Sequence, residues 1–242
     1  MRSSRKVIPN FFTTLNILCG FMALISAGDE KFVAASWLIT AAGILDLFDG
    51  QVARWMKTDS NFGIEFDSLA DVISFGVAPS LLIYKAYFYT LGYLGILISF
   101  LPLMCGCIRL ARFNIKFGGK EKSSFVGLPI PFAAISFASF IIFNYHFWDE
   151  LFLSRIMIPQ LLLISILMVS KVEYYVFPKF SFRVSKKHSL GISIIIITLI
   201  ILSFFPQKAF YPVVMIYIFW GIVRFIYNIF NSSDDDKAVE LA

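Results

Sequence analysis

Charged residues are scarce in this sequence. Only 15% of the 242 residues are charged and 58% are hydrophobic, which gives a mean hydropathy of +0.78. Soluble domains carry about 25% charged residues. The composition therefore excludes an ordinary soluble domain and favours a single compact membrane domain, and the 28 Phe residues suit a surface that faces lipid. It predicts an all-α integral membrane protein.

Cysteine and histidine are also rare. Cys19, Cys105 and Cys107 all lie in apolar segments, and an odd count without extracellular spacing argues against a disulfide framework. The Cys105-Gly-Cys107 pair has no nearby cysteine or histidine to complete a zinc site. His146 and His188 stand alone near the ends of apolar runs. Thiol and imidazole chemistry is therefore disfavoured.

The apolar runs divide the chain into spans. A spanning helix needs roughly 20 apolar residues, and we expect about eight transmembrane helices, at 10–28, 32–56, 65–87, 91–115, 129–147, 154–171, 189–205 and 209–230. We expect one membrane domain with three segments: a catalytic core at 1–135, additional membrane helices at 136–231, and a disordered acidic tail at 232–242.

Basic residues set the expected orientation. Of the 21 Lys and Arg residues, all but Lys31, Lys85, Arg155 and Lys208 fall on one side of these spans. Positive residues collect on the cytoplasmic side, so both termini are predicted to be cytoplasmic. The net charge of +5 is explained by this topology, and no nucleic-acid partner is expected. The protein is predicted to be a multi-pass protein of the cytoplasmic (inner) membrane.

Four aspartates interrupt the apolar pattern. Asp46 and Asp49 are three residues apart near the end of the second span, and Asp67 and Asp71 are four apart at the start of the third. Each pair therefore lies on one helical face. A helical hairpin would turn the two faces toward each other.

Such a group needs compensation for its charge. A carboxylate at mid-membrane depth costs about 2.5–3.5 kcal/mol, and neighbouring anions raise each other's pKa. Two divalent ions, Mg²⁺ or Mn²⁺, bind hard oxygen ligands and would remove both penalties. The alternative is a set of wetted interfacial aspartates paired with Arg54 or Lys57. Intramembrane carboxylates would also suit a cation or proton transporter.

Small and basic residues accompany the aspartates. Gly50 and Ala53 would let a ligand approach the backbone, or they would simply permit close helix packing. Arg54 would bridge to a phosphate or extend along the membrane surface.

Together these residues form Asp46-x2-Asp49-Gly50-x2-Ala53-Arg54-x8-Gly63-x3-Asp67-x3-Asp71. This pattern resembles the signature of the CDP-alcohol phosphotransferase family at every fixed position. The resemblance implies an integral-membrane enzyme that exchanges the CMP of a CDP-linked lipid for a hydroxyl acceptor. It implies that the four aspartates hold a divalent metal pair and that Asp71 is the general base. Gly50, Ala53, Arg54 and Gly63 would border the bound CDP-diacylglycerol.

Segments around this signature narrow the resemblance. "IPNFFTTLNILCG" (8–20), "FDSLADVISFGVAP" (66–79), "RLARFN" (109–114) and "GLPIP" (127–131) are similar to the membrane-embedded phosphatidylserine synthases of bacteria, over most of residues 8–135. That branch of the family implies L-serine as the acceptor, and we expect a homodimer among membrane lipids. Glycerol 3-phosphate stays open as another acceptor, because its phosphate would also bind arginine.

Further candidates lie on the first and fourth spans. Arg109 and Arg112 are one turn apart, where they could dock a carboxylate or anchor the span, and Asn114 would add a polar contact or cap the helix. These three are the predicted serine-binding residues. On the first span, Asn10, Thr13 and Asn16 recur on one face. Asn10 and Thr13 are predicted to contact CDP-diacylglycerol, although hydrogen bonds between helices are the commoner use of such a stripe.

Overall fold

The computed structural model describes residues 7–56, 61–117, 124–175, 198 and 200–240. Within these ranges six helices are long and apolar enough to cross a membrane. The all-α membrane architecture predicted from composition is therefore confirmed. The predicted span at 154–171 forms a shorter helix, and most of the predicted span at 189–205 falls outside the described residues.

The first two helices form a close hairpin. Helix α1 (Val7–Gly28) and helix α2 (Phe32–Met56) are joined by a tight turn in which Glu30 adopts a positive φ of 62°. Both helices carry alanines that are buried almost completely: Ala23, Ala27, Ala35 and Ala42. Small side chains let helix backbones approach each other in a membrane. This hairpin fixes α2, which carries the first aspartate pair, against α1.

The third predicted span is one continuous helical run that includes three segments other than α-helix. It comprises α3 (Asn61–Asp71), the π-helical segment η2 (Val72–Val77), α4 (Ala78–Ile83), the π-helical segment η3 (Tyr84–Phe88) and the 3₁₀ segment η4 (Tyr89–Leu91). Gly92, with φ of 57°, ends the run. π-helical turns occur preferentially at functional sites. Here the first of them begins directly after Asp71.

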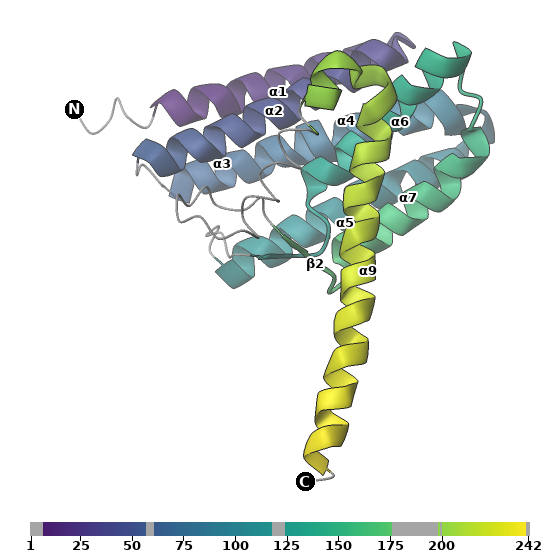
Figure 1. Ribbon diagram of the computed structural model, residues 1–242. Coiled ribbons are helices and arrows are strands. Elements are labelled where there is room, and N and C mark those ends of the chain that lie inside the picture. Colours follow the sequence, from purple (N-terminus) through teal and green to yellow (C-terminus); the bar gives the residue numbers. More distant parts are fainter. Residues whose placement is uncertain (1–6, 57–60, 118–123, 176–197, 199, 241–242) are drawn as a thin grey trace.

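Three more helices complete the body of the protein: α5 (Tyr93–Phe117), α6 (Ile130–Trp148) and α7 (Ser154–Val169). Helix α6 is the central one, with a buried series that includes Ala134, Phe137, Ala138 and Ile141. It packs against α2, α7 and α9 (Pro206–Glu240). Figure 1 shows α1, α2 and α3 side by side, whereas α9 crosses the other helices steeply and extends beyond them.

A short antiparallel ribbon links two connections that were predicted to be loops. Strand β1 (Ser124–Val126) pairs with β2 (Glu173–Tyr175), about fifty residues further along the chain. Gly127, with φ of 82°, follows β1 and donates its N–H to Val172 O at 2.8 Å. A side chain at this glycine would collide with the carbonyl of Met168. The ribbon places both connections at one end of the bundle, as the predicted topology requires.

Helix α9 continues into the C-terminal segment. Its backbone is helical to Glu240, and the disordered tail expected from residue 232 stays a prediction. The segment between 231 and 240 contains neither glycine nor proline. Nothing in it therefore breaks the helix that the preceding apolar span begins.

Candidate active site

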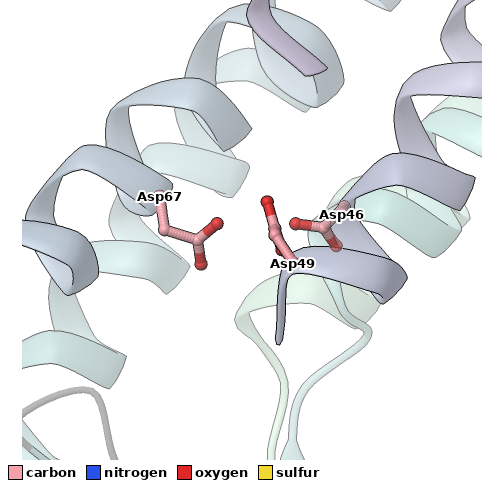
Figure 2. Close-up of side chains that lie close together, drawn as sticks. All are labelled: Asp46, Asp49 and Asp67. Atoms are coloured by element: carbon pink, nitrogen blue, oxygen red, sulfur yellow. The ribbon is translucent and has the colours of Figure 1, made fainter. Parts of the chain in front are cut away.

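Three of the four aspartates meet between two helices. Asp46 and Asp49 of α2 and Asp67 of α3 each offer a carboxylate oxygen within 4.8 Å of the others. Figure 2 shows the carboxylates of the α2 pair facing that of Asp67 across the space between the helices. The spacing of three residues brings both α2 carboxylates to one face of α2, and this face is turned toward α3.

Asp71 lies next to this group but is not one of its three members. It is the last residue of α3 and interacts electrostatically with Asp46, Asp67 and Asp49, and with the cation Arg109. Its Oδ1 atom is buried, as is Oδ1 of Asp67, and neither has a hydrogen-bond partner among the described residues. Buried carboxylate oxygens without partners are costly.

The donor set fits divalent metal ions. Three carboxylates converge and a fourth lies beside them, so the site offers hard oxygen ligands of the kind that Mg²⁺ and Mn²⁺ prefer. The unpartnered Oδ1 atoms of Asp67 and Asp71 are further oxygens that an ion would satisfy. Asp49, only 4% exposed, is the most enclosed of the group of three.

Helix α1 supports the site from the side. The hydroxyl of Thr13 donates a hydrogen bond of 3.1 Å to Oδ2 of Asp49. Thr13 was predicted to contact the lipid nucleotide, and the structure gives its hydroxyl a carboxylate partner. The backbone carbonyl of Asn10 accepts a hydrogen bond from Thr14. Asn16 is completely buried, and its backbone carbonyl accepts a hydrogen bond of 3.0 Å from Oγ of Ser74 in η2.

The two arginines of α5 have different surroundings. Arg109 is 6% exposed and interacts electrostatically with Asp71. Arg112 instead donates Nη1 to the carbonyl of Val169, the last residue of α7, at 2.8 Å. The structure therefore places Arg109 beside the carboxylates, while Arg112 joins α5 to the end of α7. Asn114 donates Nδ2 to Oγ of Ser68 at 3.0 Å, so it joins α5 to α3 beside Asp67.

The predicted nucleotide-binding residues are described in part. Gly50 is half-buried on α2 and Gly63 is half-buried on α3, so both lie on the helices that carry the aspartates. The side chains of Ala53 and Arg54 fall outside the described part of the structure.

Comparison with known proteins shows the family of the chain. Residues 6–172 match the family model described as CDP-alcohol phosphatidyltransferase. The chain belongs to this family. The matched region of this phosphatidyltransferase contains the candidate site residues Asp46, Asp49, Asp67, Asp71, Arg109 and Arg112.

Individual relatives carry more specific names. This phosphatidyltransferase is 41% identical over 230 residues to a CDP-diacylglycerol--serine O-phosphatidyltransferase of Helicobacter pylori, a match that covers 91% of the chain and 92% of the relative. A Bacillus subtilis protein with the same name is 37% identical over 177 residues, which are 71% of this chain and 92% of the relative. An archaetidylserine synthase of Methanothermobacter thermautotrophicus is 41% identical over 171 residues, or 69% of each chain.

Sequence reasoning missed three residues around the phosphatidyltransferase site. Ser68 and Ser74 make hydrogen bonds from α3 and η2. Tyr217 of α9 interacts electrostatically with Arg109 and stacks on Phe132, with ring centroids 4.5 Å apart. The two serines stand in the segment that carries the family resemblance and were detectable as polar residues near the aspartates. Tyr217 gives no such signal, because it is one aromatic residue in a long apolar run.

Proposed function

We propose that this phosphatidyltransferase transfers the phosphatidyl group of CDP-diacylglycerol to L-serine, giving phosphatidylserine and CMP. The observation that carries the proposal is the position of buried Arg109 beside Asp71, at the edge of the aspartate group. In this proposal Asp71 is the proton acceptor and Arg109 is the cation that binds the serine carboxylate. The names of the relatives support the same acceptor, because they join serine to two different kinds of lipid.

The metal requirement follows from the aspartates. Asp46, Asp49, Asp67 and Asp71 would hold two divalent ions, Mg²⁺ or Mn²⁺. When bound, these ions supply positive charge against the phosphoryl oxygens of the lipid substrate. The hydrogen bond from Thr13 fixes the orientation of the Asp49 carboxylate, and a metal ligand held in this way loses less freedom when it binds.

The chemical step needs a proton acceptor and a positioned nucleophile. The hydroxyl of serine attacks the phosphorus on the lipid side of the pyrophosphate, and Asp71 accepts the hydroxyl proton. The bond from this phosphorus to the bridging oxygen breaks, and CMP leaves with the electron pair. Arg109 binds the serine carboxylate through its planar guanidinium and so holds the hydroxyl near Asp71. Gly50 and Gly63, with Ala53 and Arg54, would border the nucleotide.

The proposed cellular setting rests on the topology predicted from the basic residues. We place the protein in the cytoplasmic membrane with the aspartate site facing the cytoplasm, where a soluble acceptor and free CMP have access. Residues 1–135 form the catalytic core in this proposal, and the later helices up to residue 231 belong to the same domain. The protein would act as a homodimer.

Glycerol 3-phosphate is the competing acceptor. Purified protein should be supplied with CDP-diacylglycerol and Mn²⁺ or Mg²⁺, and then with serine or glycerol 3-phosphate in turn. We expect CMP release and a lipid product with serine only. Release with glycerol 3-phosphate and none with serine would reassign the acceptor, and no release with either would contradict the proposed reaction.

A further inference from the structure

The side chain of Asn16 is buried in a way that a folded protein normally avoids. Its exposed fraction is 0%, and neither Nδ2 nor Oδ1 has a hydrogen-bond partner among the described residues. The fully buried Asn144 provides a contrast. Its Nδ2 donates to Phe140 O at 2.9 Å, and its Oδ1 accepts from Leu153 N at 3.0 Å. A buried amide with no partner destabilises the fold, so Asn16 calls for a ligand.

The contact made by Thr13 indicates the level of Asn16 along the helices, which is that of Asp46 and Asp71. It lies one turn beyond Thr13 on the same face of α1, and Thr13 is hydrogen-bonded to Asp49. Since α2 runs antiparallel to α1, one turn further along α1 corresponds to the level of Asp46. Helix α3 runs in the same direction as α1 (Figure 1). One turn further along α3 in this direction leads from Asp67 to Asp71.

A second contact fixes α1 against the segment that follows Asp71. Oγ of Ser74, three residues after Asp71, donates a hydrogen bond of 3.0 Å to the backbone carbonyl of Asn16. Gly20, one turn beyond Asn16, allows this close approach, because any side chain there would collide with Ser74. The backbone of Asn16 is therefore fixed against η2, while its side-chain amide has no partner among the described residues.

We propose that Asn16 is an acceptor-binding residue whose amide contacts the amino-acid substrate between Asp71 and Arg109. This inference rests on the proposed function. A hydroxyl that gives its proton to Asp71 must lie within hydrogen-bond reach of that carboxylate, so the rest of the acceptor occupies the same level as Asn16. Serine brings an ammonium group with three donors. Oδ1 of Asn16 is a neutral acceptor for one of them and adds no further anion to the aspartate group.

The chemistry separates serine from an acceptor without an amine. Glycerol 3-phosphate has no ammonium group, so it would leave Oδ1 of Asn16 without a charged donor. A site built to bind a polar group rejects an analogue that lacks it, because the buried partner then stays unpaired. Asn16 thus becomes a determinant of acceptor specificity, and Arg109 recognises the carboxylate at the other end of the amino acid.

The test compares Asn16→Leu with Asn144→Leu in the full chain, purified in detergent. Without substrates, Asn16→Leu should raise the unfolding midpoint by about 2–4 °C, because it removes an unpaired amide. Asn144→Leu should lower the midpoint, because it breaks two hydrogen bonds. In saturation assays with Mn²⁺, Asn16→Leu should raise the KM for serine by about tenfold or more. The KM for CDP-diacylglycerol should change little.

Each other outcome has a definite meaning. A lower unfolding midpoint for Asn16→Leu together with an unchanged serine KM makes Asn16 a structural residue and overturns the inference. A rise confined to the KM for CDP-diacylglycerol assigns the amide to the lipid phosphate and also overturns it. If Asn16→Leu fails to fold, Asn16→Ala and Asn144→Ala are compared instead, because alanine adds no bulk. The unfolding midpoint and the KM for serine then decide the question in the same way. Wild-type protein that releases no CMP with serine contradicts the proposed function itself.

Discussion

Thr13 of α1 donates a hydrogen bond of 3.1 Å to Oδ2 of Asp49 of α2. This contact ties the first helix to the group of carboxylates, and both residues are buried, at 5% and 4% exposed. Groups that orient a metal ligand typically change metal affinity 10–100-fold when removed. Thr13 is therefore expected to act through Asp49.

Replacing Thr13 by Val tests this role. Thr13→Val keeps the shape of the side chain but loses the donor, so the Mn²⁺ concentration that gives half-maximal CMP release should rise about 10–100-fold. Thr13→Ser retains a hydroxyl and should stay close to wild type. An unchanged Mn²⁺ requirement in Thr13→Val, with a raised KM for CDP-diacylglycerol, would show that Thr13 serves the lipid instead.

The aspartates of the group should each be needed. Asp46→Asn, Asp49→Asn and Asp67→Asn should nearly abolish CMP release in folded protein, and EDTA should do the same to wild type until Mn²⁺ is restored. Each change removes a charged oxygen ligand. Asp29→Asn is the matched control, because Asp29 is exposed in the turn after α1 and pairs with Lys31. Undiminished turnover in two of the three variants would contradict the metal site.

Asp71 should behave differently from the other aspartates. As a general base it would contribute about 10²–10⁴-fold to turnover, so Asp71→Asn should lose that factor while the protein still binds CDP-diacylglycerol. Turnover and equilibrium lipid binding should be measured on the same preparation. A parallel loss of both would make Asp71 chiefly a metal ligand.

Substitutions of the two arginines of α5 should have different effects. Loss of one charge-assisted hydrogen bond costs about 1.5–3 kcal/mol, so Arg109→Lys should raise the KM for serine about 10–150-fold. Arg112→Lys should mainly lower the unfolding midpoint, because Arg112 holds the end of α7 through Val169 O. Saturation curves and thermal unfolding of both variants check the pair. A serine defect in Arg112→Lys alone would reverse the assignment.

Topology can be tested by labelling. In a background without Cys19, Cys105 and Cys107, single cysteines at Asn61, Ser123 or Lys179 should react only from the cytoplasmic side. A cysteine at Glu30, in the turn between α1 and α2, should react only from the other side. External labelling at Asn61 would place the aspartate site on the wrong face of the membrane for the proposed reaction.

Much of the site was predictable because the spacing of residues within a single helix indicates which of them share a face. The spacing of Asp46 and Asp49, and of Asp67 and Asp71, follows the helical period, so the sequence indicates which side chains share a face. A short turn between two apolar runs then brings the two faces together. The structure confirms that carboxylates of both pairs meet, with Asp71 at the edge. The predicted roles of these residues stay predictions.

Contacts between distant segments were not predictable in the same way. The β1–β2 ribbon pairs two three-residue strands, too short for an alternating pattern to show. The local sequence therefore gave a weaker signal than the structure around it.

By itself, the sequence determined the membrane class, most of the spans and the hairpin that carries the aspartates. Hydropathy and helical period act within one segment, so they can be evaluated without knowing its neighbours. Only the tertiary structure separated Arg109 from Arg112, gave Thr13 its carboxylate partner and left the amide of Asn16 buried without one. Residues three apart on a helix differ in direction by about 60° around its axis. Which of two such side chains meets the site therefore depends on how each helix is rotated against the next, and packing of the whole bundle sets that rotation.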